Sequence, residues 1–86
     1  MLDYQEIINK LSEEGYNPYL QERLGIIFNS IDDNKGNPKV DSVSQIRIER
    51  EKIIIQYPLG QIPVEIEFKT IDELLKLIRQ VFPIDN

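Results

Sequence analysis

The residue types that most often carry out catalysis are missing from this chain. It contains no histidine and no cysteine, the side chains that most commonly titrate or attack near neutral pH. The serines, Ser12, Ser30, Ser42 and Ser44, lie in no nucleophile-elbow sequence, and the four glycines form no phosphate-binding loop. Catalysis would therefore depend on carboxylates or lysines with strongly shifted pKa values. We expect a protein that is not an enzyme and uses no cofactor.

Two groups of acidic residues have spacings that need comparison with known sites. Glu65 and Glu67 alternate along a predicted strand and share one face, which indicates a solvated charge ladder, because a glycosidase acid pair needs a cleft. Residues 32–36 have the composition of a calcium loop. However, Gly36 stands at position five instead of six, and Val43 takes the place of the glutamate at position twelve. We therefore expect no metal site.

Four residues are candidates for contact with a partner: Tyr16, Tyr19, Arg47 and Arg50. The two tyrosines flank a predicted junction between helices, where a tyrosine brings a large contact area. Packing of this corner against the core is the alternative interpretation. The two arginines, with Lys52, give a predicted hairpin a basic tip that nearby glutamates nearly neutralise.

The net charge of −5 disfavours binding to nucleic acid or to an anionic membrane, and it permits a basic protein partner. Five acidic residues crowd the N-terminal third: Asp3, Glu6, Glu13, Glu14 and Glu22. The first alternative function is therefore an acidic nucleic-acid mimic that inhibits a basic DNA- or RNA-binding protein. A weak nucleic-acid binder that uses the basic hairpin tip is the second alternative.

Sequence composition also bears on location and origin. No apolar run approaches the roughly 18 residues of a membrane span, and the first residues lack the pattern of a signal peptide. We expect a cytoplasmic protein without membrane contact. Fifteen isoleucines and no alanine suggest A/T-rich codons, and hence a low-GC microbe or one of its phages or other mobile elements.

Two helices are clearly indicated. Asp3 is a predicted N-cap, and an apolar stripe at helical spacing ends at Gly15, which predicts a helix over about residues 4–14. Near the C-terminus a Thr-x-x-Glu capping box at Thr70 starts a second apolar stripe that ends before Pro83.

The middle of the chain is less regular. Pro18 suits the first position of a further helix, and apolar residues recur at helical spacing from Leu20 to Ile31. A short strand over residues 24–31 is the alternative, which we disfavour because apolar residues there fall on both faces. A turn-rich loop follows over residues 32–42.

Alternating apolar residues predict three strands, around residues 46–48, 53–55 and 62–68, with turns at 49–52 and 58–61. We expect the strand at 53–55 to be central because it is apolar on both faces, and Pro63 predicts that the third strand is an edge strand or begins with a bulge. The expected fold is one small α+β domain over residues 1–86. Its helices pack on one face of a three-stranded antiparallel meander, in the order α-α-β-β-β-α.

These observations favour a function carried out by binding instead of catalysis. We expect a non-catalytic protein-binding module, a small regulatory or accessory protein that occludes or bridges a protein partner. The usual scaling predicts that roughly 64% of the unfolded surface is buried on folding, so the core is modest. A homodimer is compatible with this size, and an exposed edge strand offers one way to pair.

Overall fold

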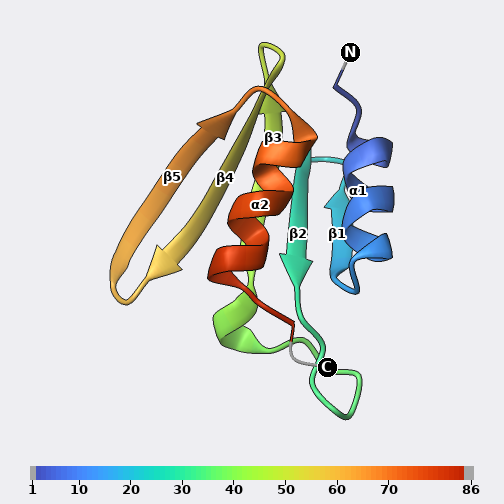
Figure 1. Cartoon of the computed structure of the whole chain (residues 1–86), viewed down its shortest axis with the longest axis vertical. Helices are drawn as coiled ribbons and strands as arrows, with labels where there is room; N and C mark the ends of the chain where they lie inside the picture. Colours follow the sequence, from blue (N-terminus) through green and yellow to red (C-terminus); the bar gives the residue numbers. More distant parts are fainter. Residues whose placement is uncertain (1, 85–86) are drawn as a thin grey trace.

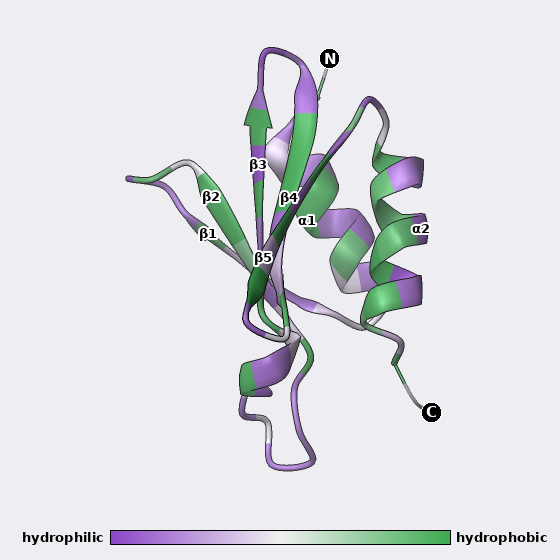
Figure 2. Ribbon diagram, turned by 90° about the vertical axis from the view of Figure 1, so that its left-hand side faces the viewer, coloured by the Kyte–Doolittle hydropathy of each residue, from purple (hydrophilic) through white to green (hydrophobic). Residues whose placement is uncertain are grey.

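The computed structural model describes residues 2–84. Its elements are α1 (Tyr4–Glu13), β1 (Asn17–Gln21), β2 (Ile26–Ser30), the 3-10 helix η1 (Val40–Ser42), β3 (Ser44–Glu49), β4 (Lys52–Leu59), β5 (Ile62–Phe68) and α2 (Ile71–Val81). The strands form one five-stranded antiparallel sheet in which each strand pairs with the next in the chain (Figure 1). Both α-helices lie on the same side of this sheet (Figure 2). We call the opposite side the helix-free face.

The predicted order α-α-β-β-β-α is wrong, although the α+β class is confirmed. The residues expected to form a second helix form the β1–β2 hairpin instead, so the sheet has five strands rather than three. The alternative of a strand within residues 24–31 is the correct one, because β2 occupies Ile26–Ser30. Gly25 closes the β1–β2 turn with a φ of +64°, a conformation that favours glycine.

Two physical reasons explain why the pattern of apolar residues does not predict the β1–β2 hairpin. Ile27 lies fully buried in the core, while its neighbours Ile26 and Phe28 point to the helix-free face and are half-buried there. A strand with apolar residues on both faces loses the alternation that identifies strands. Pro18 suits a helix start, but it also suits β1, because β1 is an edge strand of the sheet.

The ends of both α-helices agree with the sequence prediction. The Asp3 side chain caps α1, and the Thr70 side chain caps α2. After α1 the chain turns at Gly15, whose φ is +98°. The backbone N–H of Tyr16 then donates to the Leu11 carbonyl at 3.0 Å, as in a Schellman motif. This turn directs the chain from α1 into β1.

The core lies between the sheet and the two helices. It consists of buried side chains from both helices and from β2, β3 and β4, with Tyr16 and Phe82 at one end: Ile7, Leu11, Tyr16, Ile27, Ile46, Ile53, Ile55, Tyr57, Leu74, Leu75, Ile78 and Phe82. Phe82 packs edge-on against Tyr57, with 5.6 Å between ring centroids. The core thus holds α1 and α2 against one side of the sheet and leaves the helix-free face to solvent.

The Tyr4 hydroxyl ties α1 to two strands. It donates to the Gly25 carbonyl at 2.6 Å and accepts from the Ile48 N–H at 3.0 Å. Tyr4→Phe leaves both backbone groups without this partner, so we expect it to lower the free energy of unfolding by about 1–3 kcal/mol. Urea denaturation measures the loss. Tyr19→Phe at an exposed site is the control, and equal stability of the two variants would refute the bridging role.

Two buried serines on either side of Val43 make a contrasting pair. The Ser42 hydroxyl accepts from the Ile31 N–H at 2.9 Å and donates to the Lys39 carbonyl at 2.7 Å. The Ser44 hydroxyl is buried without a hydrogen-bond partner among residues 2–84. We expect Ser44→Ala to raise the free energy of unfolding by about 1 kcal/mol and Ser42→Ala to lower it by about 1–3 kcal/mol. Thermal and urea unfolding test these opposite signs, and a loss at both serines would contradict the assignment for Ser44.

Candidate functional site

The helix-free face carries a row of side chains that crosses all five strands. Tyr19 lies opposite Phe28, and the register continues through Gln45 and Gln56 to Glu65. The row begins with an aromatic pair on β1 and β2 and ends with polar side chains on β3, β4 and β5. The helix-free face is therefore divided into an apolar half and a polar half.

The apolar half is an open patch made of Tyr19, Leu24, Ile26 and Phe28. Tyr19 is 62% exposed and Leu24 is 63% exposed, while the other two side chains are half-buried. The turn between β1 and β2, which carries Leu24, projects away from the helices (Figure 2). Large apolar side chains that gather at a surface indicate a contact site more strongly than isolated ones.

A shallow groove of about 360 Å³ lies beside the open patch on the same face. Its lining residues are Val40, Val43, Gln45, Gln56, Tyr57, Pro58, Gln61 and Pro63. Gln45 pairs with Phe28 across β2 and β3, so it forms the border between the groove and the open patch. Val40, on η1, is 91% exposed at the other side of the groove. The groove extends the uncharged part of the helix-free face.

The polar half is a charge ladder made of Arg47, Glu49, Lys52, Glu65 and Glu67. Arg47 binds Glu49 at 2.8 Å and Glu65 at 3.0 Å, and Lys52 lies 3.6 Å from Glu67. The hydrogen bonds that the Arg47 guanidinium donates to Glu49 and Glu65 raise its pKa. Ile54 lies in the same rows as Arg47 and Glu67 and is only 5% exposed. The charge ladder therefore covers the apolar side chain of Ile54, and its acidic and basic side chains bind one another.

The structure separates the four candidate contact residues. Tyr16 is 7% exposed in the core, its hydroxyl donates to the Phe82 carbonyl at 2.6 Å, and burial raises its pKa. Tyr19 lies in the open patch and Arg47 in the charge ladder, on one face of the sheet. Arg50 is exposed at the β3–β4 turn with a φ of +51°, a backbone conformation that costs a non-glycine residue about 1–2 kcal/mol.

Three members of the open patch were not predicted as contact residues from the sequence: Leu24, Ile26 and Phe28. The signal was present in the run of apolar residues from Leu24 to Phe28, which falls on both faces of a strand. In the sequence alone, such a run argues against a strand because it lacks regular alternation. A strand with one face in a core and the other at a contact surface shows the same pattern.

The acidic residues considered for nucleic-acid mimicry are divided between different roles. Asp3 caps α1, Glu14 binds Arg79, and Glu22 lies in the β1–β2 turn. Glu6 and Glu13 are exposed on α1. These five carboxylates therefore do not line one face at a regular spacing, as an imitation of a phosphate backbone requires.

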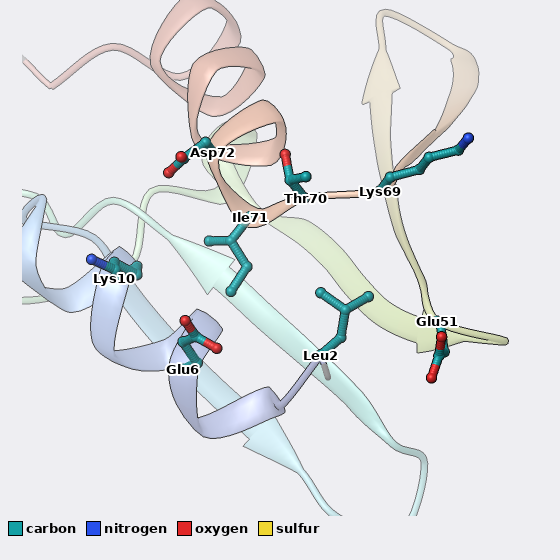
Figure 3. A pocket seen from close by; sticks show the side chains of 8 residues that line it. All are labelled: Leu2, Glu6, Lys10, Glu51, Lys69, Thr70, Ile71 and Asp72. Atoms are coloured by element: carbon teal, nitrogen blue, oxygen red, sulfur yellow. The ribbon is translucent and has the colours of Figure 1, made fainter.

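A cavity of about 590 Å³ lies between the N-terminal ends of α1 and α2 (Figure 3). Leu2 and Ile71 point into the space between the helices, and charged side chains surround them. The charged residues of the lining are Glu6, Lys10, Glu51, Lys69 and Asp72. Because the lining carries both acidic and basic groups, this cavity favours neither an anion nor a cation.

Glu14 and Arg79 join the C-terminal ends of the two helices. The Arg79 Nε donates to Glu14 Oε1 at 2.7 Å, and this hydrogen bond holds the pKa of the Glu14 carboxyl below its usual value of 4.5. A lowered folded-state pKa contributes stability above the unfolded pKa, and that stability is lost as the pH falls through the folded value.

We therefore expect Glu14→Gln to be less stable than the wild type at pH 7 and to approach it below about pH 4. Urea midpoints at several pH values measure this convergence. Arg79→Gln removes the same pair from the other side and should give the same pH dependence. A constant difference between Glu14→Gln and the wild type at every pH would contradict the pair's contribution.

Within residues 2–84, no group of three or more acidic side chains could hold a metal ion, and no helix is long and apolar enough to cross a membrane. Comparison of the chain with protein-family models, with curated proteins and with solved structures found no match.

Proposed function

We propose that this chain is a non-catalytic protein-binding module, a small accessory protein that acts by contact through the helix-free face of its sheet. The observation that carries the proposal is the open patch. Tyr19 and Leu24 are more than three-fifths exposed beside the half-buried Ile26 and Phe28. Tyrosine and phenylalanine are enriched at protein interfaces, where they supply large contact areas.

The chemistry of the face supports a protein partner over a charged ligand. The open patch and the groove beside it are uncharged, and the arginine and lysine of the charge ladder bind glutamates of the same chain. A partner therefore gains mainly from burial of apolar surface, at about 25 cal/mol per Å². Such binding survives salt better than binding between unpaired charges.

The edges of the sheet are less suitable for contact than its face. β1 and β5 are the edge strands, and they carry Pro18 and Pro63. Proline has no N–H to donate to an added strand, and edge prolines are a common protection against strand pairing. We therefore assign the contact to the side chains of the helix-free face.

Affinity capture from the organism of origin tests the proposal, with two variants of matched exposure. The patch variant is Tyr19→Ser with Leu24→Ser. The tip variant is Leu59→Ser with Ile62→Ser, whose side chains are 64% and 69% exposed on another part of the sheet. A protein captured by the wild type is then purified, and its affinity for each chain is measured.

We expect the patch variant to lose at least tenfold in affinity, about 1.4 kcal/mol, and the tip variant to bind as the wild type does. Equal binding by both variants would overturn the assignment to the helix-free face. A partner that is a nucleic-acid-binding protein and is released by moderate salt would instead support the acidic mimic.

A further inference from the structure

We infer that the occupant of the open patch is a second copy of this chain, so that two sheets pack face to face with the helices on the outside. This inference rests on the proposed function, because it names the partner of the same surface. The pairing is isologous: a twofold axis places Tyr19, Leu24 and Phe28 of one copy against the same patch of the other.

Charge favours this face for self-association. The charge ladder contains two basic and three acidic side chains, nearly balanced and bound to one another. The two α-helices with their caps carry six acidic and three basic residues. Two copies with a net charge of −5 each repel wherever their acidic surfaces meet. The helix-free face is therefore the side on which copies meet with little repulsion.

The proposed arrangement also separates the acidic helices. Sheets that pack face to face lie about 10 Å apart, and each helix layer lies beyond its own sheet (Figure 2). Charges separated by more than about 8 Å are largely screened at physiological ionic strength. The helix layers of the two copies therefore contribute little repulsion to such a dimer.

The surface area of the chain is consistent with one interface of standard size. The accessible surface is 6142 Å², whereas a folded monomer of 10.1 kDa is expected to expose about 5,300 Å². A dimer with a typical stable interface would cover about 800 Å² of this surface on each copy. Burial of the open patch and the adjoining groove would bring the exposed surface toward the expected value.

Sedimentation equilibrium over a concentration series tests the inference with the purified full chain. The wild type should form a dimer. The variant Tyr19→Arg with Leu24→Arg places like charges opposite one another across the twofold axis, and we expect it to raise the dimer dissociation constant at least 100-fold. The control Leu59→Arg with Ile62→Arg adds the same charge at equally exposed sites and should dimerise as the wild type does.

The outcomes are distinct. Circular dichroism and urea midpoints first confirm that each variant is folded. A wild type that is monomeric up to about 1 mM, or a dimer that only the control variant disrupts, would overturn the inference. If the wild type is monomeric while a captured protein still depends on Tyr19 and Leu24, the proposed function stands and the second copy alone is rejected. If neither dimerisation nor the binding of a captured protein depends on Tyr19 and Leu24, both the proposed function and the inference are rejected.

Discussion

Tyr16→Ala is expected to lower the free energy of unfolding by about 3–5 kcal/mol, a large share of the roughly 4–13 kcal/mol expected for a domain of this length. The ring is 7% exposed and packs in the core at the point where the chain passes from α1 to β1. Its hydroxyl also donates to the Phe82 carbonyl at 2.6 Å, beyond the last turn of α2. The substitution thus removes a large buried side chain and a contact between the two ends of the chain.

Two further variants separate these contributions. Tyr16→Phe keeps the ring and removes the hydrogen bond, so we expect a loss of about 1 kcal/mol. Tyr19→Ala, three positions away at a 62% exposed site, should change the stability by no more than about 0.5 kcal/mol. Urea denaturation measures all three variants. A loss for Tyr16→Ala as small as that for Tyr19→Ala would mean that Tyr16 is not part of the core.

Ile55→Ala is expected to lower the free energy of unfolding by about 2–5 kcal/mol. Ile55 has no exposed surface, and β4 has a paired strand on each side, so the cavity left by the substitution has little room to collapse. Ile62→Ala, on the neighbouring strand at a 69% exposed site, should stay within about 0.5 kcal/mol of the wild type.

Guanidinium and thermal unfolding of these two isoleucine variants check the placement of the core on the helix side of β4. Equal losses for Ile55→Ala and Ile62→Ala would contradict it. A preserved m-value alongside the lower midpoint for Ile55→Ala would show that the change affects stability and not the two-state character of unfolding.

Much of the fold follows from local chemistry that the sequence displays. The caps at Asp3 and Thr70 determine where α1 and α2 begin, and Pro63 correctly predicts that β5 is an edge strand. The turn of the β3–β4 hairpin also falls where the polar residues indicate it, at Arg50 and Glu51. These features depend on neighbours in the sequence, which a single chain shows directly.

The β1–β2 hairpin could not be predicted in the same way, because its two faces meet different surroundings. Ile27 faces the helices and Phe28 faces the opposite side. Only the packed structure shows which face of the sheet the helices cover. The periodicity of residues 20–31 therefore fits a helix as well as a strand with an apolar residue on each face.

For the same reason, the sequence predicts only part of the candidate site. The sequence predicts Tyr19 as a contact residue at a helix junction, yet Tyr19 lies on a strand. Leu24 and Phe28 fit the helical spacing of apolar residues from Leu20 to Ile31. The sequence predicts Arg47 as a contact residue because of its charge, and in the structure Glu49 and Glu65 bind it. Strand pairing, which decides these contacts, joins residues far apart in the sequence.

Covalent footprinting of exposed side chains tests the central claim most directly, because it reports which face is covered when the protein is associated. The chain is labelled alone at low concentration and again in its associated state, as a dimer or with the captured protein. We predict several-fold protection of Tyr19 and Leu24 on association, with Leu59 and Ile62 labelled as in the free chain. Protection of the β4–β5 tip or of the exposed helix residues, with Tyr19 and Leu24 labelled as before, would contradict the account.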